Sequence, residues 1–300
     1  MDKNIFSGLE DLGFDDANEL NLYNKANIEP SKEDLAKVIK DSKLNEIEKQ
    51  KSLLYDKEVT CPSCNHVFKA RTVKTSAYRV LKKESDFFII YSTINPYFYD
   101  VWLCNVCGYT SMKADFEKIK SSQIELIQNK ISVKWHGKKY PEVYDLHIAI
   151  ERYKLALLNY AVMDSKSSKK AMTCLKIAWM YRVDKKPESE QIFLAQALEG
   201  FNDAYFNESF PLYGMDKFTL MYLIGELNRR IHKFDEALKW FSSVITTPNI
   251  SQRLKELARD QKDIIRKVEN ESNKEASNTT MKEDNLENKK RGFFSNFFKK

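Results

Sequence analysis

The chain contains little glycine and little proline, with 8 Gly and 7 Pro among 300 residues. β-Sandwiches and β-barrels need many tight turns, which these two residues usually provide, so their scarcity favours helices. A chain of this length also exceeds the size that one hydrophobic core usually serves. We therefore expect more than one folded unit, with helices in the majority.

Long apolar runs are missing as well. No stretch approaches the roughly 20 apolar residues of a membrane-spanning helix. The first residues, MDKNIFSGLEDLGFDD, carry acids where a secretory signal has a basic head and a continuous apolar core. We expect a cytoplasmic protein, with the inner membrane face as a site of peripheral contact if its C-terminal tail binds lipid.

Motifs of catalysis are also lacking. The sequence has no phosphate-cradling glycine loop, no HExxH and no nucleophile elbow. His147 and Glu151 share one predicted helix face, but such a pair is more often a surface contact than a catalytic unit. The sequence predicts neither an enzyme nor a small-molecule substrate.

Four of the 5 cysteines fall in two CxxC motifs, CPSC at Cys61 and Cys64 and CNVC at Cys104 and Cys107. Structural disulfides are rare in a reducing cytoplasm, and two thiolates separated by two residues supply two corners of a tetrahedral zinc site. The residue after each pair, Asn65 or Gly108, tolerates the positive φ that such a turn often requires. We predict one structural Zn²⁺ bound by these four cysteines.

Other roles for the thiols remain open. A dithiol redox site needs one pair of low pKa beside a helix N-terminus and leaves the second pair without a use. A hydrolytic zinc site keeps one position for water, and His66 would have to replace a cysteine there, although an exposed strand residue is the commoner case. Cys174, on an apolar helix face, is expected to be a buried core residue.

The pattern divides the chain into four parts and predicts a mainly α member of the α+β class. Residues 1–55 form an acidic segment and a lead-in helix whose apolar face extends to Leu54, and residues 56–140 form a zinc-ribbon-like β module with a long insertion. Strands are expected in HVFKARTV, FFIIYSTI and YFYDVWL. Residues 141–270 form a helical array, and residues 271–300 form a flexible polar tail.

The array is predicted to contain helices over residues 144–162, 168–183, 187–208, 216–231, 234–247 and 251–269. Gly225, Phe234, Ala237 and Phe241 match the spacing of a tetratricopeptide repeat, in which small residues let two helices approach closely. Stacked helical hairpins form a concave groove that binds peptides, so an unidentified protein partner is expected. Four side chains are candidates for that groove, although arginines are more often solvated surface residues: Tyr181, Arg182, Arg229 and Arg230.

The C-terminus, KKRGFFSNFFKK, repeats pairs of aromatic residues between basic ones. On a helix Phe293, Phe294, Phe297 and Phe298 share one side. This segment is predicted either to contact an anionic membrane surface weakly, to dock in a groove, or to remain a tail without a role.

The leading functional hypothesis is a zinc-stabilised adaptor or scaffold. The alternative is a nucleic-acid-binding zinc ribbon, because residues 61–140 carry 13 Lys and Arg against 6 Asp and Glu. Aromatic residues interleave with this charge and offer surfaces for base stacking. The residues concerned are Lys69, Arg71, Lys74, Arg79, Lys82 and Lys83, with Phe68, Tyr78, Phe87 and Phe88. A metalloenzyme is the third class and needs an open metal site.

The ordered series CPSC, SDFF, NPYFYDVWLCNVCGY, LKIAWMYR, YLIGELNRR and EALKWF resembles the uncharacterised bacterial family catalogued as domain of unknown function 2225. The resemblance covers roughly residues 53–267. It implies paired cysteines at Cys61, Cys64, Cys104 and Cys107, with Asp86, Tyr99 and Gly108 in the intervening module. It also implies a cysteine module followed by tetratricopeptide-like helices, and it implies no activity.

Overall fold

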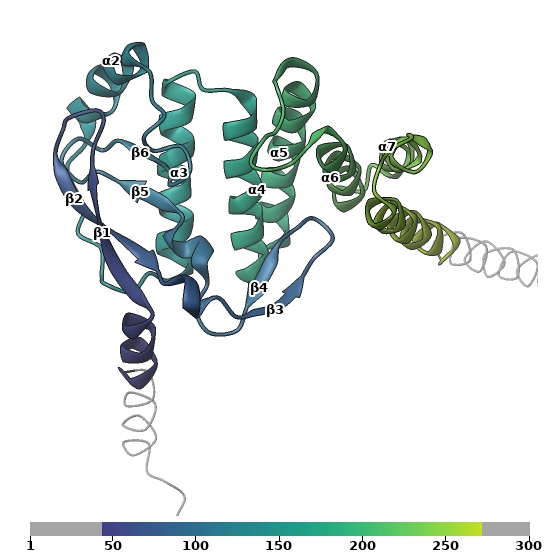
Figure 1. Cartoon of the computed structure of the whole chain (residues 1–300), viewed down its shortest axis with the longest axis horizontal. Coiled ribbons are helices and arrows are strands. Elements are labelled where there is room, and N and C mark those ends of the chain that lie inside the picture. The colour runs from purple at the N-terminus through teal and green to yellow at the C-terminus, as the bar shows by residue number, and fades with distance from the viewer. Residues whose placement is uncertain (1–43, 272–300) are drawn as a thin grey trace, which may run out of the picture. The chain divides into compact units, whose positions relative to one another are not determined.

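The computed structural model describes residues 44–271 (Figure 1). Contacts within the chain define two units, Met1–Glu48 and Lys49–Lys300. Of the first unit only residues 44–48, which are helical, are described. Of the second unit, residues 49–271 are described.

In residues 49–271, six short strands form three separate antiparallel pairs. β1 (Leu54–Thr60) pairs with β2 (Val67–Val73), β3 (Val80–Lys83) with β4 (Ile89–Tyr91), and β5 (Val101–Leu103) with β6 (Thr110–Met112). The first and third pairs each connect through one CxxC motif. The two hairpins that carry the cysteines thus have the same strand–loop–strand arrangement.

The strand predictions were only partly correct. β2 matches its prediction, but FFIIYSTI forms a strand only over Ile89–Tyr91 and YFYDVWL only over Val101–Leu103. Pro96–Tyr99 is a 3-10 helix instead, because Pro96 suits a first helical turn and the Asn95 side chain accepts a hydrogen bond from the Tyr97 backbone N–H. The lead-in helix stops before Leu54, which opens β1 and pairs with Val73.

Helices follow the strands. The first of them, α2 (Ser121–Lys130), was not predicted. The next five begin and end within two residues of their predicted bounds: α3 (Leu146–Val162), α4 (Ser167–Val183), α5 (Pro187–Asn207), α6 (Lys217–Arg230) and α7 (Phe234–Thr246). Residues 252–271 form the last described helix. The side chains of Asp145 and Asp216 cap α3 and α6 by accepting hydrogen bonds from backbone N–H groups of the first turn. The fold is mainly helical with small antiparallel strand pairs, as expected.

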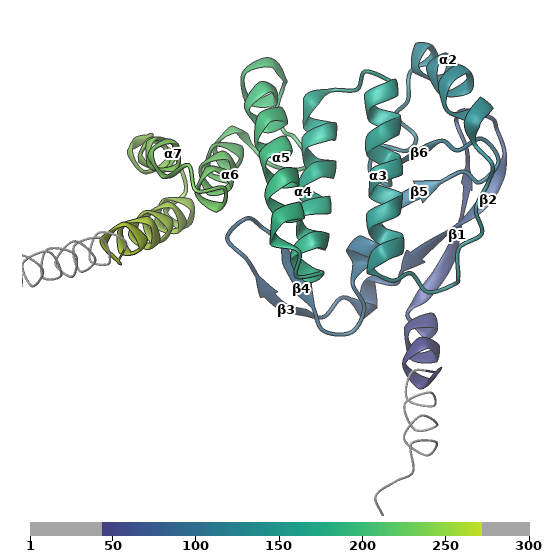
Figure 2. The same ribbon diagram turned by 180° about the vertical axis from the view of Figure 1, so that it is seen from behind.

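α3, α4 and α5 lie side by side, with β5 and β6 against α3 and with α6 beyond α5 (Figures 1 and 2). One apolar cluster extends from Val59 in β1 to Leu227 in α6. Polar contacts join α3 to the third hairpin, since the Tyr160 hydroxyl accepts a hydrogen bond from Met112 N and Asn159 Oδ1 accepts one from Thr110 N. The cysteine hairpins and the helices therefore share a core.

A second apolar cluster lies between α6, α7 and the last described helix. Gly225 allows α6 and α7 to approach closely, because a Cβ at this position would lie 2.9 Å from Phe241 Cε1 and 3.1 Å from Trp240 Cβ. The close contact predicted from the spacing of Gly225 and Phe241 is thus present. Within the part of the chain that the structure describes, no helix is both long and apolar enough to cross a membrane.

Candidate metal centre

The two CxxC loops have the same backbone geometry. In the first loop Cys61 N donates to His66 O at 2.9 Å and Asn65 N donates to Cys61 O at 2.8 Å. In the second loop Cys104 N donates to Tyr109 O and Gly108 N donates to Cys104 O at the same two distances, 2.9 and 2.8 Å. Each hairpin therefore presents its pair of cysteines through an equivalent turn.

The residue after each pair has the left-handed conformation that the sequence predicted. Asn65 has φ of 58° and Gly108 has φ of 74°. Asparagine and glycine adopt this region at the lowest cost, which explains their place in these turns. At Gly108 there is also no room for a side chain, because a Cβ would lie 2.7 Å from Trp135 Cγ.

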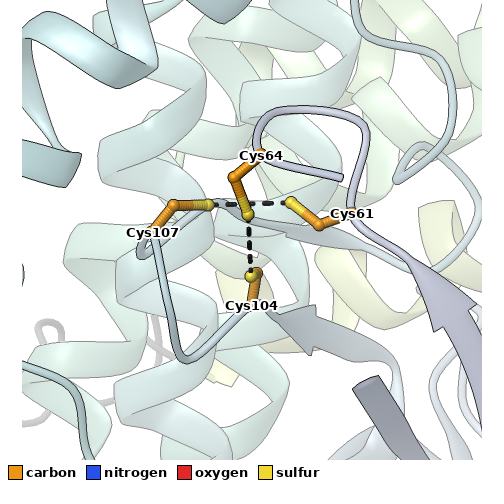
Figure 3. A group of neighbouring side chains, drawn as sticks. All are labelled: Cys61, Cys64, Cys104 and Cys107. Carbon is orange, nitrogen blue, oxygen red and sulfur yellow. Dashed lines mark hydrogen bonds between the residues drawn. The ribbon is translucent and has the colours of Figure 1, made fainter. Parts of the chain in front are cut away.

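The four sulfur atoms converge on one point between the hairpins (Figure 3). Cys61 Sγ lies 3.6 Å from Cys107 Sγ, and Cys64 Sγ lies 3.6 Å from Cys104 Sγ, so each close pair contains one cysteine from each hairpin. All four atoms lie within 4.8 Å of one another. Zinc–sulfur bonds of about 2.3 Å at tetrahedral angles place sulfur atoms about 3.8 Å apart, so this cluster fits a tetrahedral metal ion.

Electrostatics within the cluster also favour a cation. Hydrogen bonds from Cys107 and Cys61 lower the pKa of the Cys104 thiol, so one thiolate is stabilised by its neighbours. The hydrogen bonds with Cys104 and then Cys107 raise the pKa of Cys61, so a second negative charge is opposed. Cys61 and Cys104 are buried, and a bound cation would offset the repulsion among four thiolates.

A shell of hydrogen bonds from later residues supports the loops. Gln128 Nε2, in α2, donates to Ser63 O at 2.9 Å, and Ser132 Oγ donates to Cys107 O at 2.8 Å. Trp135 Nε1 donates to Asn105 O at 2.9 Å. These three residues were not predicted, because no local pattern links a glutamine, a serine or a tryptophan to a loop far from it in the sequence.

The remaining thiol and the neighbouring histidine lie outside the cluster. His66 is exposed and is not among the grouped ligand atoms. Cys174 is buried in α4, and burial raises the pKa of its thiol to about 12. Cys174 is therefore a buried core residue, as predicted, and it is held as a neutral thiol.

Comparison with known families agrees with this arrangement of paired cysteines and helices. Residues 54–265 match the family described as "Uncharacterized protein conserved in bacteria (DUF2225)". The chain belongs to this family. Neither the curated proteins nor the solved structures contain a match to the chain.

The arginines predicted to line a groove take part in a network of ion pairs. Arg182 in α4 contacts Glu84, Asp86 and Glu190, with nitrogen–oxygen distances of 2.5 to 2.7 Å. Arg229 and Arg230 in α6 contact Glu226 at 2.7 and 2.8 Å. Tyr181 stacks on Phe193 of α5. The groove role of these four residues stays a prediction.

Part of this network borders a cavity of about 350 Å³. Arg182, Arg229 and Arg230 line one part of it, and Phe234, Ile264 and Val268 line another. The cavity is thus bounded by α4, the start of α5, α6, the start of α7 and the last described helix. Charged and apolar groups lie together there, as they do in many peptide-binding sites.

The residues nominated for nucleic-acid binding are only partly available to a ligand. Phe88 is buried, and Phe68 and Phe87 pack against the core. Arg71 pairs with Asp56 at 3.2 Å, and Arg79 donates to the carbonyl of Ser76. Tyr78 is exposed. The four tail residues nominated for membrane contact, Phe293, Phe294, Phe297 and Phe298, lie outside the described residues.

Proposed function

We propose that the protein is a zinc-stabilised adaptor that binds a protein partner through its helices. The observation that carries the proposal is the four-sulfur cluster, because four cysteine ligands complete a tetrahedral shell and leave no position for water or substrate. An ion held in this way stabilises the two hairpins that present the cysteines. The functional surface is then expected elsewhere, on the helices.

Zinc is the metal that this donor set favours. Four thiolates are soft ligands, and tetrahedral sites with four sulfur donors are typical of zinc or of iron–sulfur centres. The close sulfur–sulfur distances of 3.6 Å match the edge of a single-ion tetrahedron. Both pairs also lie in turns whose backbone N–H groups face the sulfur side, which supports a structural zinc site.

The docking surface that we propose is the one formed by α6, α7 and the last described helix. The contact of Gly225 with Phe241 supports a degenerate tetratricopeptide-like hairpin, in which a small residue accepts a large one from the next helix. The cavity of about 350 Å³ beside this hairpin contains Ile264, whose side chain is 40% exposed. An apolar side chain of a partner would bury Ile264 there, while the arginines of the cavity would fix the orientation of the partner.

We also propose that the protein is cytoplasmic and that its C-terminal tail contacts the inner membrane face. The basic and aromatic composition of residues 289–300 supports it, because such segments bind anionic lipid surfaces. Deletion of residues 289–300 should abolish flotation of the protein with anionic liposomes. Equal flotation of the two forms would refute the membrane contact and leave the adaptor role in place.

The adaptor role is tested by affinity purification of the full chain from its native cell, followed by mass spectrometry. Ile264→Asp places a charge in the proposed docking cavity, and Val133→Asp places the same charge at another exposed apolar position, which is 70% exposed and lies outside this cavity. A partner captured by the unchanged chain and by Val133→Asp, but lost with Ile264→Asp, supports the role. A partner retained equally by all three forms refutes the docking surface, and co-purified nucleic acid without a protein favours the alternative.

A further inference from the structure

A second cavity, of about 430 Å³, lies between three segments that are distant in the sequence. Its walls come from the loop after β6, from the start of α4 and from the connection between α5 and α6. Five side chains that are charged at neutral pH line it: Asp115, Lys118, Lys166, Lys169 and Glu208. Its volume lies in the range of sites that bind small molecules, which is about 300 to 1,000 Å³.

A buried carboxylate lies on one wall of this cavity. Asp115 is 6% exposed, and its Oδ2 accepts hydrogen bonds from the Tyr160 hydroxyl at 3.1 Å and the Tyr213 hydroxyl at 2.5 Å. Lys169 Nζ lies 3.4 Å from Asp115 Oδ1. The negative charge of Asp115 is therefore matched within the protein, by one ammonium group and two hydroxyl donors.

The second carboxylate of the cavity is also satisfied. Glu208 Oε1 accepts a hydrogen bond from Ser168 N at 2.8 Å, and Glu208 Oε2 accepts one from Ser168 Oγ at 2.6 Å. Glu208 thus caps the start of α4, where a carboxylate is favoured by the unpaired N–H groups. It needs no further cation from the cavity.

Two lysines of the cavity are left without a carboxylate. Lys118 and Lys166 are exposed, and neither forms an ion pair with any residue between 44 and 271. The cavity is lined by three ammonium groups and two carboxylates, which leaves a net charge of +1. With Lys169 paired with Asp115, the ammonium groups of Lys118 and Lys166 are the ones left to bind an anion.

The backbone beside the cavity is held in a strained conformation. Tyr213 has φ of 49°, a region that is unfavourable for a non-glycine residue, and Gly214 follows with φ of 78°. Main-chain hydrogen bonds between Leu212 and Met215 close this turn, and the Tyr213 hydroxyl donates a hydrogen bond to Asp115. These hydrogen bonds hold the strained turn, and with it one wall of the cavity, in place.

We propose that this cavity binds a small organic phosphate monoester. A phosphate monoester carries a charge of about −1.5 to −2 at neutral pH, and Lys118 and Lys166 offer it two ammonium groups that form no ion pair within the described residues. Lysine binds phosphate as a point charge, and the Ser209 side chain lies at the cavity as a further polar group. Binding of such a ligand requires no reaction, so the proposal is independent of whether the protein is an enzyme.

The test is isothermal titration calorimetry of the full-length, metal-loaded chain with glycerol 3-phosphate, with glycerol as the uncharged control. We expect saturable binding with a Kd of about 1 mM or tighter for the phosphate ester and none for glycerol. The double variant Lys118→Gln/Lys166→Gln should bind at least about tenfold more weakly, since the two lost charge contacts together are worth about 1.4 kcal/mol or more. Absence of saturable binding to the unchanged chain would refute the site.

Two matched variants separate this cavity from general attraction to a basic protein. Lys69→Gln/Lys139→Gln removes the same charge at two exposed lysines that do not line the cavity, and it should bind as the unchanged chain does. Ser209→Trp fills the cavity without changing its charge, and it should abolish binding. Equal weakening by both lysine pairs, or full binding by Ser209→Trp, would refute the proposal.

The phosphate group could also belong to a lipid head group, and a second arm of the experiment distinguishes this source. Co-sedimentation with vesicles that contain phosphatidic acid presents the same phosphate at a membrane surface. Binding of free glycerol 3-phosphate supports a soluble ligand. Binding to the vesicles without binding to the free ester would overturn the assignment to a small molecule.

Discussion

Asp86 Oδ2 lies 2.7 Å from Nη2 of Arg182, which follows Asp86 by 96 residues. The Asp86 side chain is fully buried between the second hairpin and the helices, and it also accepts a hydrogen bond from Trp179 Nε1 at 3.0 Å. Arg230 adds a second guanidinium, with Nε 3.5 Å from Asp86 Oδ2. The turn between β3 and β4 is thereby fastened to α4 and α6 through one carboxylate.

Asp86→Ala should destabilise the protein strongly. The substitution leaves the partly buried Arg182 without one of its three carboxylate partners, and removing one member of a buried ion pair typically costs about 3 to 5 kcal/mol. Urea unfolding followed by circular dichroism would measure this loss. Asp263→Ala is the control, because its pair with Arg266 is more than 60% exposed on both sides and contributes less than about 1 kcal/mol.

Acid should weaken the same contact. Burial of Asp86 opposes its ionisation, but the Arg182 hydrogen bonds and the charges of Arg230 and Arg182 outweigh burial and lower the pKa of Asp86 below 3.8. Since the unfolded state then binds the proton more readily, the contribution of ionised Asp86 to the free energy of unfolding is complete above about pH 4 and is lost as the pH falls through the lowered pKa. Asp86→Asn removes the carboxyl group that titrates. The difference in unfolding free energy between the unchanged chain and this variant should therefore shrink as the pH falls from 5 to 3. Parallel curves would contradict it.

The helices and the metal ligands were predictable because their signals are local. Apolar spacing, capping aspartates and Pro187 mark the helices within a few residues, and the two CxxC motifs followed by Asn65 and Gly108 determine the turns at the cluster. α2 was missed because its sequence, SSQIELIQNK, contains only three large apolar residues and buries only Ile127. β1 was missed because LYDKEVT is largely exposed and is a strand through its pairing with β2.

The ion pairs of the arginines could not be predicted from local sequence signals. Arg182, Arg229 and Arg230 are polar residues on predicted helices, which suggested a groove or a solvated surface. Arg182 and Arg230 pair with Glu84 and Asp86, which lie in a hairpin 96 or more residues away in the sequence, and only the fold brings these charges together. The shared core between the cysteine hairpins and α3 has the same origin, since it depends on side chains such as Tyr160 that contact Met112.

Cys64→Ser should lower the metal content of the purified protein and its melting temperature. The variant replaces one of four sulfur ligands by a poorer donor, and the free energy of metal binding is part of the free energy of folding. Metal content measured by mass spectrometry should fall well below one ion per chain, from about one in the unchanged protein. Cys174→Ala is the control: it removes the thiol outside the cluster and should keep the full metal content.

Gly225→Ala should destabilise the contact between α6 and α7 although alanine favours helices. The added Cβ would lie 2.9 Å from Phe241 Cε1, and overpacking of this kind costs about 1 to 3 kcal/mol, which exceeds the gain in helix propensity of about 1 kcal/mol at most sites. Phe241→Leu in the same chain should relieve part of the clash. A double-mutant cycle in urea tests this, and simple additivity of the two changes would contradict the direct contact.

Gly108→Ala compared with Gly137→Ala isolates the role of the second cysteine turn. Both glycines have φ of 74°, so alanine introduces similar backbone strain at each position. At Gly108 the new Cβ would lie 2.7 Å from Trp135 Cγ, whereas at Gly137 the nearest atom, Asn105 O, would lie at 3.5 Å. Only the first substitution therefore displaces the turn that presents Cys104 and Cys107.

Competition with a chelator, followed by measurement of the metal that remains bound, gives the relative affinity of the two variants. We expect Gly108→Ala to lose metal at least about tenfold more readily than Gly137→Ala, the effect expected when the support of a metal ligand is disturbed. Trp135→Gly removes all three atoms that the new Cβ would meet, so Gly108→Ala should lower the affinity less in the Trp135→Gly background than in the unchanged chain. Equal affinities of the two single variants would show that the turn tolerates displacement, and the metal would then be held by the sulfur atoms without help from the packing of Gly108 on Trp135.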